Sequence, residues 1–146
     1  MRIALASDHA GLQLRSIIIE HLHDLEHEVI DHGPDSTDSV DYPDFAEKVA
    51  HSVTTNEADC GILVCGTGVG MAMAANRVAG IRAAVCESGY TVRMTRLHNN
   101  ANVLCLGERV VGAGQALELV KIFLETKYEG GRHQNRLDKL KALENN

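Results

Sequence analysis

The chain has no tryptophan, only two prolines and few aromatic residues, which make up 3% of its 146 residues. No apolar run approaches the roughly 18 residues of a membrane span, and the N-terminus turns polar at Asp8, too early for a secretion signal. No proline-rich or low-complexity segment divides the chain. We therefore expect one cytoplasmic domain over residues 1–146, with a real buried core and no membrane partner.

The cysteines and the net charge argue against several further classes of function. The four cysteines form no C-x-x-C pair, and all lie in or beside apolar runs, which argues against a zinc knuckle or a secreted disulfide framework. The net charge of −6 argues against a nucleic-acid partner. A small anionic ligand would need a local basic pocket on this acidic chain.

Short apolar runs alternate with amphipathic segments along the whole chain, a pattern typical of a parallel sheet with helices on both faces. Leu14, Ile18 and Leu22, for example, share one helix face. The expected fold is α/β, a Rossmann-like three-layer αβα sandwich with a five-stranded parallel sheet. The predicted strands cover residues 2–7, 29–30, 60–65, 81–86 and 103–106, and the predicted helices cover residues 12–25, 43–53, 70–78, 88–97, 113–126 and 132–143.

The most informative stretch is Cys65-Gly66-Thr67-Gly68-Val69-Gly70, where a predicted strand passes through a tight turn into a helix. Glycines there let the backbone approach a ligand, and free N–H groups favour an anion. The dinucleotide pattern G-x-G-x-x-G fails because Met71 and Met73 occupy its last position, and no Gly-Lys-Ser/Thr follows. We therefore expect an anion-binding loop without a nucleotide cofactor.

Cys65 is the last residue before this turn. Neighbouring amides and a positive helix end predict a lowered pKa for its thiol, which would make it a candidate base or nucleophile. A buried cysteine is also a common small core residue, and the residues alone leave both interpretations open.

Other polar residues follow the predicted strands. Asp8 and His9 follow the first and Arg109 follows the fifth, so they belong at the carboxyl edge, where ligands of open α/β sheets bind. His98 and Asn99 close the helix before the fifth strand, which places them at the opposite edge. They can join the same site only through a neighbouring subunit or an unusual loop.

Arg132 and Arg136 lie four residues apart and share a helix face. Two guanidiniums can bind one phosphate, although the residues alone favour a solvated basic helix that also carries Lys139 and Lys141. His23 and His27 have the spacing of metal ligands, but no third ligand converges with them, and we predict no metal site. A thiol, a histidine, an anion-binding loop and an arginine pair together suggest proton transfer on a small phosphate ester.

Five motifs occur in order between residues 7 and 136: Ser7-Asp8-His9-Ala10-Gly11, the loop from Cys65 to Met71, Ala74-Ala75-Asn76-Arg77 with Gly80-Ile81-Arg82-Ala83-Ala84, His98-Asn99-Asn100-Ala101-Asn102, and Gly131-Arg132-His133-x-x-Arg136. Together they resemble the type B ribose-5-phosphate isomerase family, which includes allose-6-phosphate and galactose-6-phosphate isomerases. No acidic residue lies between Cys65 and Asn76, so the branch of this family with a cysteine base is the better match, rather than the branch with a glutamate.

The resemblance implies a homodimer or homotetramer whose active sites are shared between subunits, with the helix over residues 132–143 at or near an interface. It implies interconversion of ribose 5-phosphate and ribulose 5-phosphate, a step of the pentose phosphate pathway, through an enediolate and without metal or other cofactor. Cys65 would be the base, His98 would open the sugar ring from the partner subunit, and Thr67 would stabilise the enediolate. Substrate would contact Asp8, His9, Tyr42, Gly66, Gly68, Val69, Gly70, Asn99, Arg109, Arg132 and Arg136.

Two alternatives remain open. A six-carbon substrate, allose 6-phosphate or galactose 6-phosphate, would use the same chemistry in a longer pocket. A non-catalytic regulator that binds a sugar phosphate would use the same fold without turnover.

Overall fold

The structure, a computed structural model, describes residues 1–145, so the predicted domain is described except for Asn146. Five parallel strands form one sheet in the order β2-β1-β3-β5-β4. The predicted five-stranded parallel sheet is confirmed. The strands are β1 (Arg2–Ser7), β2 (Glu28–Asp31), β3 (Cys60–Cys65), β4 (Ala83–Val85) and β5 (Val103–Gly107).

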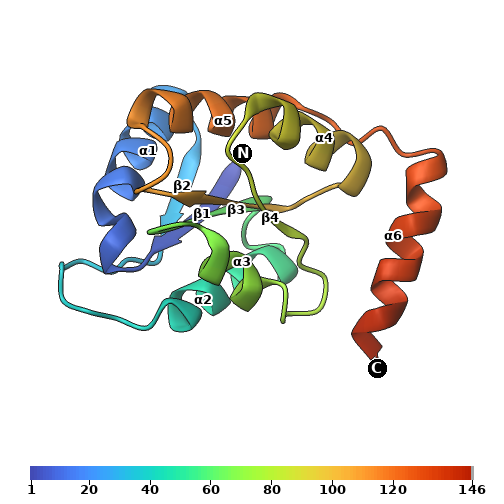
Figure 1. Cartoon of the computed structure of the whole chain (residues 1–146), viewed down its shortest axis with the longest axis horizontal. Helices are drawn as coiled ribbons and strands as arrows, with labels where there is room; N and C mark the ends of the chain where they lie inside the picture. The colour runs from blue at the N-terminus through green and yellow to red at the C-terminus, as the bar shows by residue number, and fades with distance from the viewer. Residues whose placement is uncertain (146) are drawn as a thin grey trace.

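Helices cover both faces of this sheet, which confirms the three-layer sandwich (Figure 1). One face carries α1 (Leu12–Asp24), α4 (Gly89–Asn99) and α5 (Ala113–Glu125). The other carries α2 (Tyr42–Thr54) and α3 (Val69–Ala75). The remaining elements are α6 (Arg132–Ala142) and the short 3₁₀ helices η1 (His9–Gly11) and η2 (Leu143–Asn145).

Each central strand contributes side chains to two hydrophobic cores, one on each face of the sheet, because successive side chains point to opposite faces. In β3, Ile62 and Val64 pack with the α1, α4 and α5 side, whereas Leu63 and Cys65 pack with the α2 and α3 side. A strand buried on both faces must be apolar throughout. This explains why β3 is a continuous apolar run that ends at the thiol.

Two predicted elements are shorter in the structure by more than one residue. The strand predicted over residues 81–86 is reduced to β4, which starts at Ala83. Just before it, a side chain takes the place of a backbone partner, because Arg82 N–H donates to Asn102 Oδ1 at 2.7 Å. The helix predicted over residues 70–78 ends at Ala75. Turn hydrogen bonds replace it, with Arg77 N–H donating to Ala74 C=O and Val78 N–H to Ala75 C=O.

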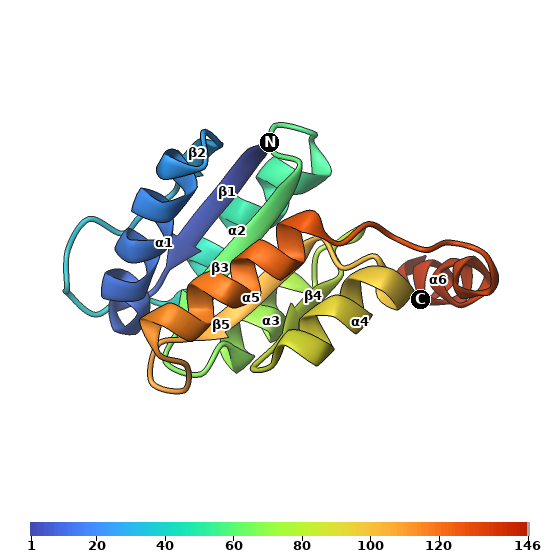
Figure 2. The same ribbon diagram turned by 90° about the horizontal axis from the view of Figure 1, so that it is seen from above.

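The C-terminal helix α6 stands away from the three layers, as both ribbon views show (Figures 1 and 2). Gly130 and Gly131 precede it with positive φ of 69° and 59°, a conformation that favours glycine. Beyond its far end, the Glu144 carboxylate accepts from Gly80 N–H at 2.9 Å. Among residues 1–145, no helix combines the length and apolar character needed to cross a membrane.

Gly61 marks the closest approach of α2 to the sheet. An added Cβ would overlap Val49 Cγ1 and lie 3.3 Å from Val103 Cγ2. Both neighbours are β-branched side chains that cannot easily rotate away. The packing of α2 on β3 therefore requires a residue without a side chain.

We predict that Gly61→Ala lowers the free energy of unfolding by about 1–3 kcal/mol through overpacking. Gly114→Ala is the matched control, because nothing lies within 4 Å of its added methyl group and alanine favours a helix. Urea denaturation of both variants measures the difference. Equal stability of the two variants would contradict this account of the α2 packing.

Candidate functional site

The site forms where β1, β3 and β5 end side by side. Backbone hydrogen bonds tie the three following loops together: Asp8 N–H donates to Val64 C=O at 3.1 Å, and Glu108 N–H donates to Cys65 C=O at 2.9 Å. Arg109 N–H also donates to Gly66 C=O at 3.1 Å. The sequence prediction that Asp8, Cys65 and Arg109 meet at the carboxyl edge is therefore confirmed.

The thiol of Cys65 lies directly against the glycine loop. Gly68 N–H donates a hydrogen bond to Cys65 Sγ at 3.1 Å, and an N–H donor at this position supports negative charge on the sulfur. Gly68 has φ of 81°, and an added Cβ would lie 3.1 Å from the Leu106 carbonyl carbon. The loop therefore needs glycine at this position for both its conformation and its contact with β5.

Two side chains pack on the other glycines of the loop. An added Cβ on Gly66 would lie 3.1 Å from Arg109 Nη1, and one on Gly70 would lie 2.9 Å from the Tyr42 ring. The Arg109 guanidinium and the Tyr42 ring thus flank the loop that follows Cys65. This supports the prediction that both residues line the site.

The β1 loop contributes Asp8 and His9. The buried Asp8 carboxylate accepts hydrogen bonds from Ala10 N–H at 2.9 Å and Gly11 N–H at 3.2 Å, which orders η1. The exposed His9 accepts from Val40 N–H through Nδ1 at 3.2 Å. Since Nδ1 is an acceptor, a neutral His9 ring carries its proton on Nε2, which is left as a donor for a ligand.

Sequence reasoning missed a buried arginine behind this loop. Arg15, on α1, donates to Ser7 Oγ at 2.7 Å and to Pro34 C=O at 2.5 Å, and its Nε lies 3.2 Å from Asp31 Oδ1. These contacts hold the loop after β2 against the end of β1, beside Asp8. A basic residue next to Leu14 in an apolar helix face was the only signal in the sequence.

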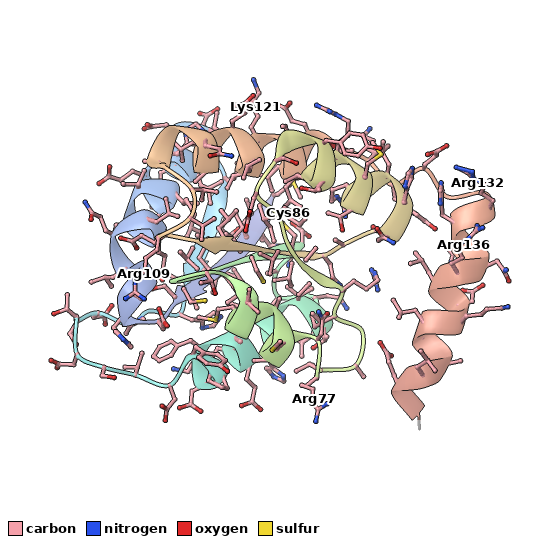
Figure 3. The ribbon with its side chains drawn as sticks, in the orientation of Figure 1. Arg77, Cys86, Arg109, Lys121, Arg132 and Arg136 are labelled. Carbon is pink, nitrogen blue, oxygen red and sulfur yellow. The ribbon has the colours of Figure 1, made fainter. Side chains whose placement is uncertain are left out.

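The other predicted site residues lie elsewhere in the chain. Figure 3 shows Arg109 at one end of the molecule and Arg132 and Arg136 on the separate helix at the other end. His98 and Asn99 form the last turn of α4, at the edge opposite Cys65, as predicted. One chain therefore does not bring these four residues to the thiol.

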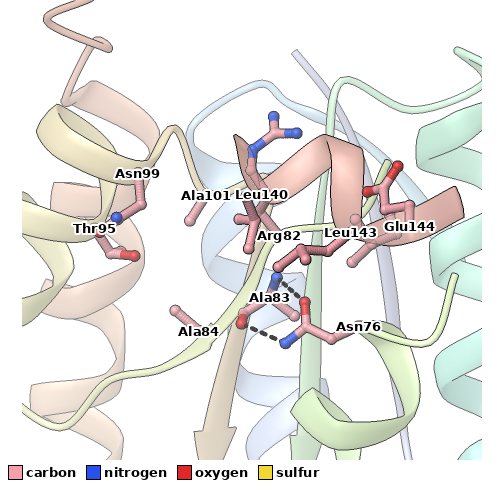
Figure 4. Close-up of a pocket in the computed structure, with 11 residues that line it drawn as sticks. Asn76, Arg82, Ala83, Ala84, Thr95, Asn99, Ala101, Leu140, Leu143 and Glu144 are labelled. Carbon is pink, nitrogen blue, oxygen red and sulfur yellow. Dashed lines mark hydrogen bonds between the residues drawn. The ribbon is translucent and has the colours of Figure 1, made fainter. Parts of the chain in front are cut away.

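A cavity of about 440 Å³ separates α6 and η2 from the sheet. It is lined by four separate parts of the chain, including Asn76, Arg82 and Asn99, as Figure 4 shows. Leu140 and Leu143 line it too, although 49% and 65% of their surfaces are exposed. This cavity is therefore partly apolar, and Cys65 does not line it.

One cluster has the donor types of a metal site: the ligand atoms of His98, Glu129 and His133 lie within 4.8 Å of one another. The two imidazoles are stacked, with centroids 4.3 Å apart and planes inclined by 17°. An ion bound in the plane of both rings must lie where the planes meet, and nearly parallel planes do not meet nearby. The cluster is thus built as a stacked pair rather than as a metal centre.

The remaining cysteines are all free and buried. Burial raises the pKa of Cys60 to about 12, and it also raises the pKa of Cys86 and Cys105. These thiols stay protonated near neutral pH, and no role is predicted for them from the sequence.

Comparison with known proteins identifies the family. The sequence profile described as Ribose/Galactose Isomerase matches residues 3–140. The chain belongs to the ribose/galactose isomerase family. The resemblance predicted from the motifs is therefore confirmed.

Individual members of this family match nearly the whole chain. Ribose-5-phosphate isomerase B of Escherichia coli K12 is 48% identical and covers 98% of this chain and 96% of its own. The structure of the Clostridium thermocellum ribose-5-phosphate isomerase B has a TM-score of 0.98, 50% identity, and coverage of 99% and 98%. That of the Mycoplasma genitalium enzyme, with bound ribulose-5-phosphate, has a TM-score of 0.95, 49% identity, and coverage of 99% and 96%.

We predict that iodoacetamide alkylates Cys65 before any other cysteine. The thiolate is the reactive form, and a thiol of pKa about 12 is only about 10⁻⁴ ionised at pH 8. Reaction at Cys60 should therefore be slow at pH 8 and should rise about tenfold per pH unit below pH 12. Peptide mapping by mass spectrometry checks the order, and earlier labelling of Cys60, Cys86 or Cys105 would contradict it.

Proposed function

We propose that this chain interconverts ribose 5-phosphate and ribulose 5-phosphate, with Cys65 as the base. The observation that carries the proposal is the Cys65 sulfur at the end of β3, with Gly68 N–H on it at 3.1 Å. The relative from Mycoplasma genitalium, 49% identical, holds ribulose-5-phosphate. A single base beside a loop of amides is what aldose–ketose isomerisation requires.

The proton transfer balances with one thiolate. In the open-chain aldose, Cys65 removes the proton from C2, and the electron pair moves onto O1 to form an enediolate. Cys65 returns the proton to C1, while the proton on O2 passes to O1 and leaves the ketone at C2. The Thr67 hydroxyl and the loop amides stabilise the charge on the enediolate oxygens.

The substrate phosphate is held by residues of two copies of the chain. Of the phosphate ligands, His9 and Arg109 come from the copy that supplies Cys65, and Arg132 and Arg136 come from the other copy. That other copy also supplies His98 and Asn99, which contact the sugar. This assignment is supported by their location. Arg132 and Arg136 lie at the end of the molecule remote from Arg109 (Figure 3), and His98, next to Asn99 at the end of α4, stacks on His133 between them in the sequence. Opposite charge and paired N–H donors make arginine the usual partner of a phosphate.

The assembly is a homodimer or homotetramer, with α6 at or near the subunit interface. Two features support this: α6 stands away from the body of the chain (Figure 2), and its segment exposes Leu140 and Leu143 beside the cavity. Exposed apolar side chains around an opening are typical of protein contact surfaces.

We predict that Cys65→Ala lowers kcat about 10²–10⁴-fold with little change in KM, because it removes the proton acceptor and leaves the phosphate contacts. Cys105→Ala is the matched control: it removes another buried sulfur from the same core, on the neighbouring strand, and should keep near wild-type kcat. A coupled assay of ribulose 5-phosphate formation, with EDTA present, measures both.

Two outcomes of this assay would contradict the proposal. If the wild type turned over allose 6-phosphate faster than ribose 5-phosphate, the substrate would be a six-carbon sugar phosphate instead. Binding of ribose 5-phosphate without any turnover would favour a regulator.

A further inference from the structure

His133 makes a contact that the proposed reaction does not yet use. Its ring stacks on the His98 ring with centroids 4.3 Å apart and an angle of 17° between the planes. His133 is only 6% exposed, and its Nε2 has no hydrogen-bond partner within the described part of the chain. The nearest carboxylate, that of Glu129, is 3.5 Å from this nitrogen. Packing against His98, rather than a hydrogen bond through this nitrogen, therefore accounts for the position of the ring.

The backbone beside the stack is fixed as well. Glu129 N–H donates to Leu97 C=O at 3.1 Å, which joins the segment before α6 to the last turn of α4. Arg96 Nε donates to Thr126 C=O at 3.1 Å, and Arg96 Nη1 donates to Asn100 Oδ1 at 3.2 Å. The last turn of α4 is thus tied, through Arg96 and Leu97, to the segment that joins α5 to α6.

We propose that His133 is a positioning residue for His98, fixing the plane of its imidazole for ring opening. This inference rests on the proposed function, in which His98 acts on the furanose ring of the substrate. His98 is half-buried and lies in the last turn of a helix, so its ring has torsional freedom that must be lost before it can transfer a proton. A stacked neighbour removes that freedom before the substrate binds.

A purely structural role predicts something different. Arg132 precedes His133 directly, and Arg136 lies one turn later on the same helix. If His133 only anchored α6, its loss would displace these arginines and weaken binding of every phosphate substrate. If His133 positions His98, removing its side chain must slow the step that opens the sugar ring.

The test uses two substrates that differ in that step. The 4-deoxy analogue of ribose 5-phosphate lacks the hydroxyl group that closes the furanose ring, so it needs isomerisation but no ring opening. We expect His133→Ala to lower kcat on ribose 5-phosphate about tenfold and to change kcat on the analogue less than about twofold. His133→Phe keeps a ring of similar shape without nitrogen, and it should recover most of the loss. His98→Asn is the reference for complete loss of the ring-opening group.

Several results would overturn the inference: equal losses of kcat on both substrates, a rise in KM without a selective loss of kcat, or His133→Phe no better than His133→Ala. A failure of His98→Asn to discriminate between the substrates would also overturn it. If the wild type turned over neither substrate, the proposed function itself would be rejected.

A second measurement tests the contact itself without any substrate. The His98 ring-proton resonance, assigned by its absence in His98→Asn, should carry a ring-current shift from the stacked imidazole. His133→Ala should move it toward the shift of a free histidine, and His133→Phe should not. An unmoved resonance in His133→Ala would show that no stack exists in solution.

Discussion

The glycine loop rests directly on the end of β5, and the rest of the site depends on this contact. An added Cβ on Gly107 would lie 2.7 Å from the Thr67 backbone, so the loop can reach this position only over a glycine. The contact holds Gly68 N–H on the Cys65 sulfur. The parallel register then brings the ends of β1 and β5 to either side of the thiol. Backbone packing, rather than a network of side chains, therefore builds the reactive edge.

The second constraint is that one chain holds only half of the proposed site. Cys65 ends β3, and Arg109 follows β5 at the same edge of the sheet. The helix α6 lies at the other end of the molecule from Arg109 (Figure 3), and His98 stacks on its residue His133. The second half is itself organised, since the His98–His133 stack joins α4 to α6. In the proposed assembly, the partner subunit therefore contributes His98 and the arginines of α6 to the site from two helices that are packed together.

Much of this could be predicted from the sequence. Alternating apolar and amphipathic segments predicted the parallel sheet, and strand ends predicted the grouping of Asp8, Cys65 and Arg109. The strand order and the buried Arg15 could not be predicted, because they depend on contacts between distant segments. The strand prediction over residues 81–86 also failed where a side chain replaces a backbone partner, as Asn102 does at Arg82. The His98–His133 stack joins residues 35 positions apart and leaves no local pattern.

The sharing of the site between subunits is tested most directly by mixing two inactive chains. Hybrid dimers of a Cys65→Ala chain and a His98→Asn chain, isolated with two different tags, would contain one site with both groups intact. Our account predicts that such hybrids recover about half of the wild-type activity per dimer on ribose 5-phosphate, whereas each variant alone stays nearly inactive. Hybrids as inactive as the parent variants would show that Cys65 and His98 act within one chain, or not in the same reaction.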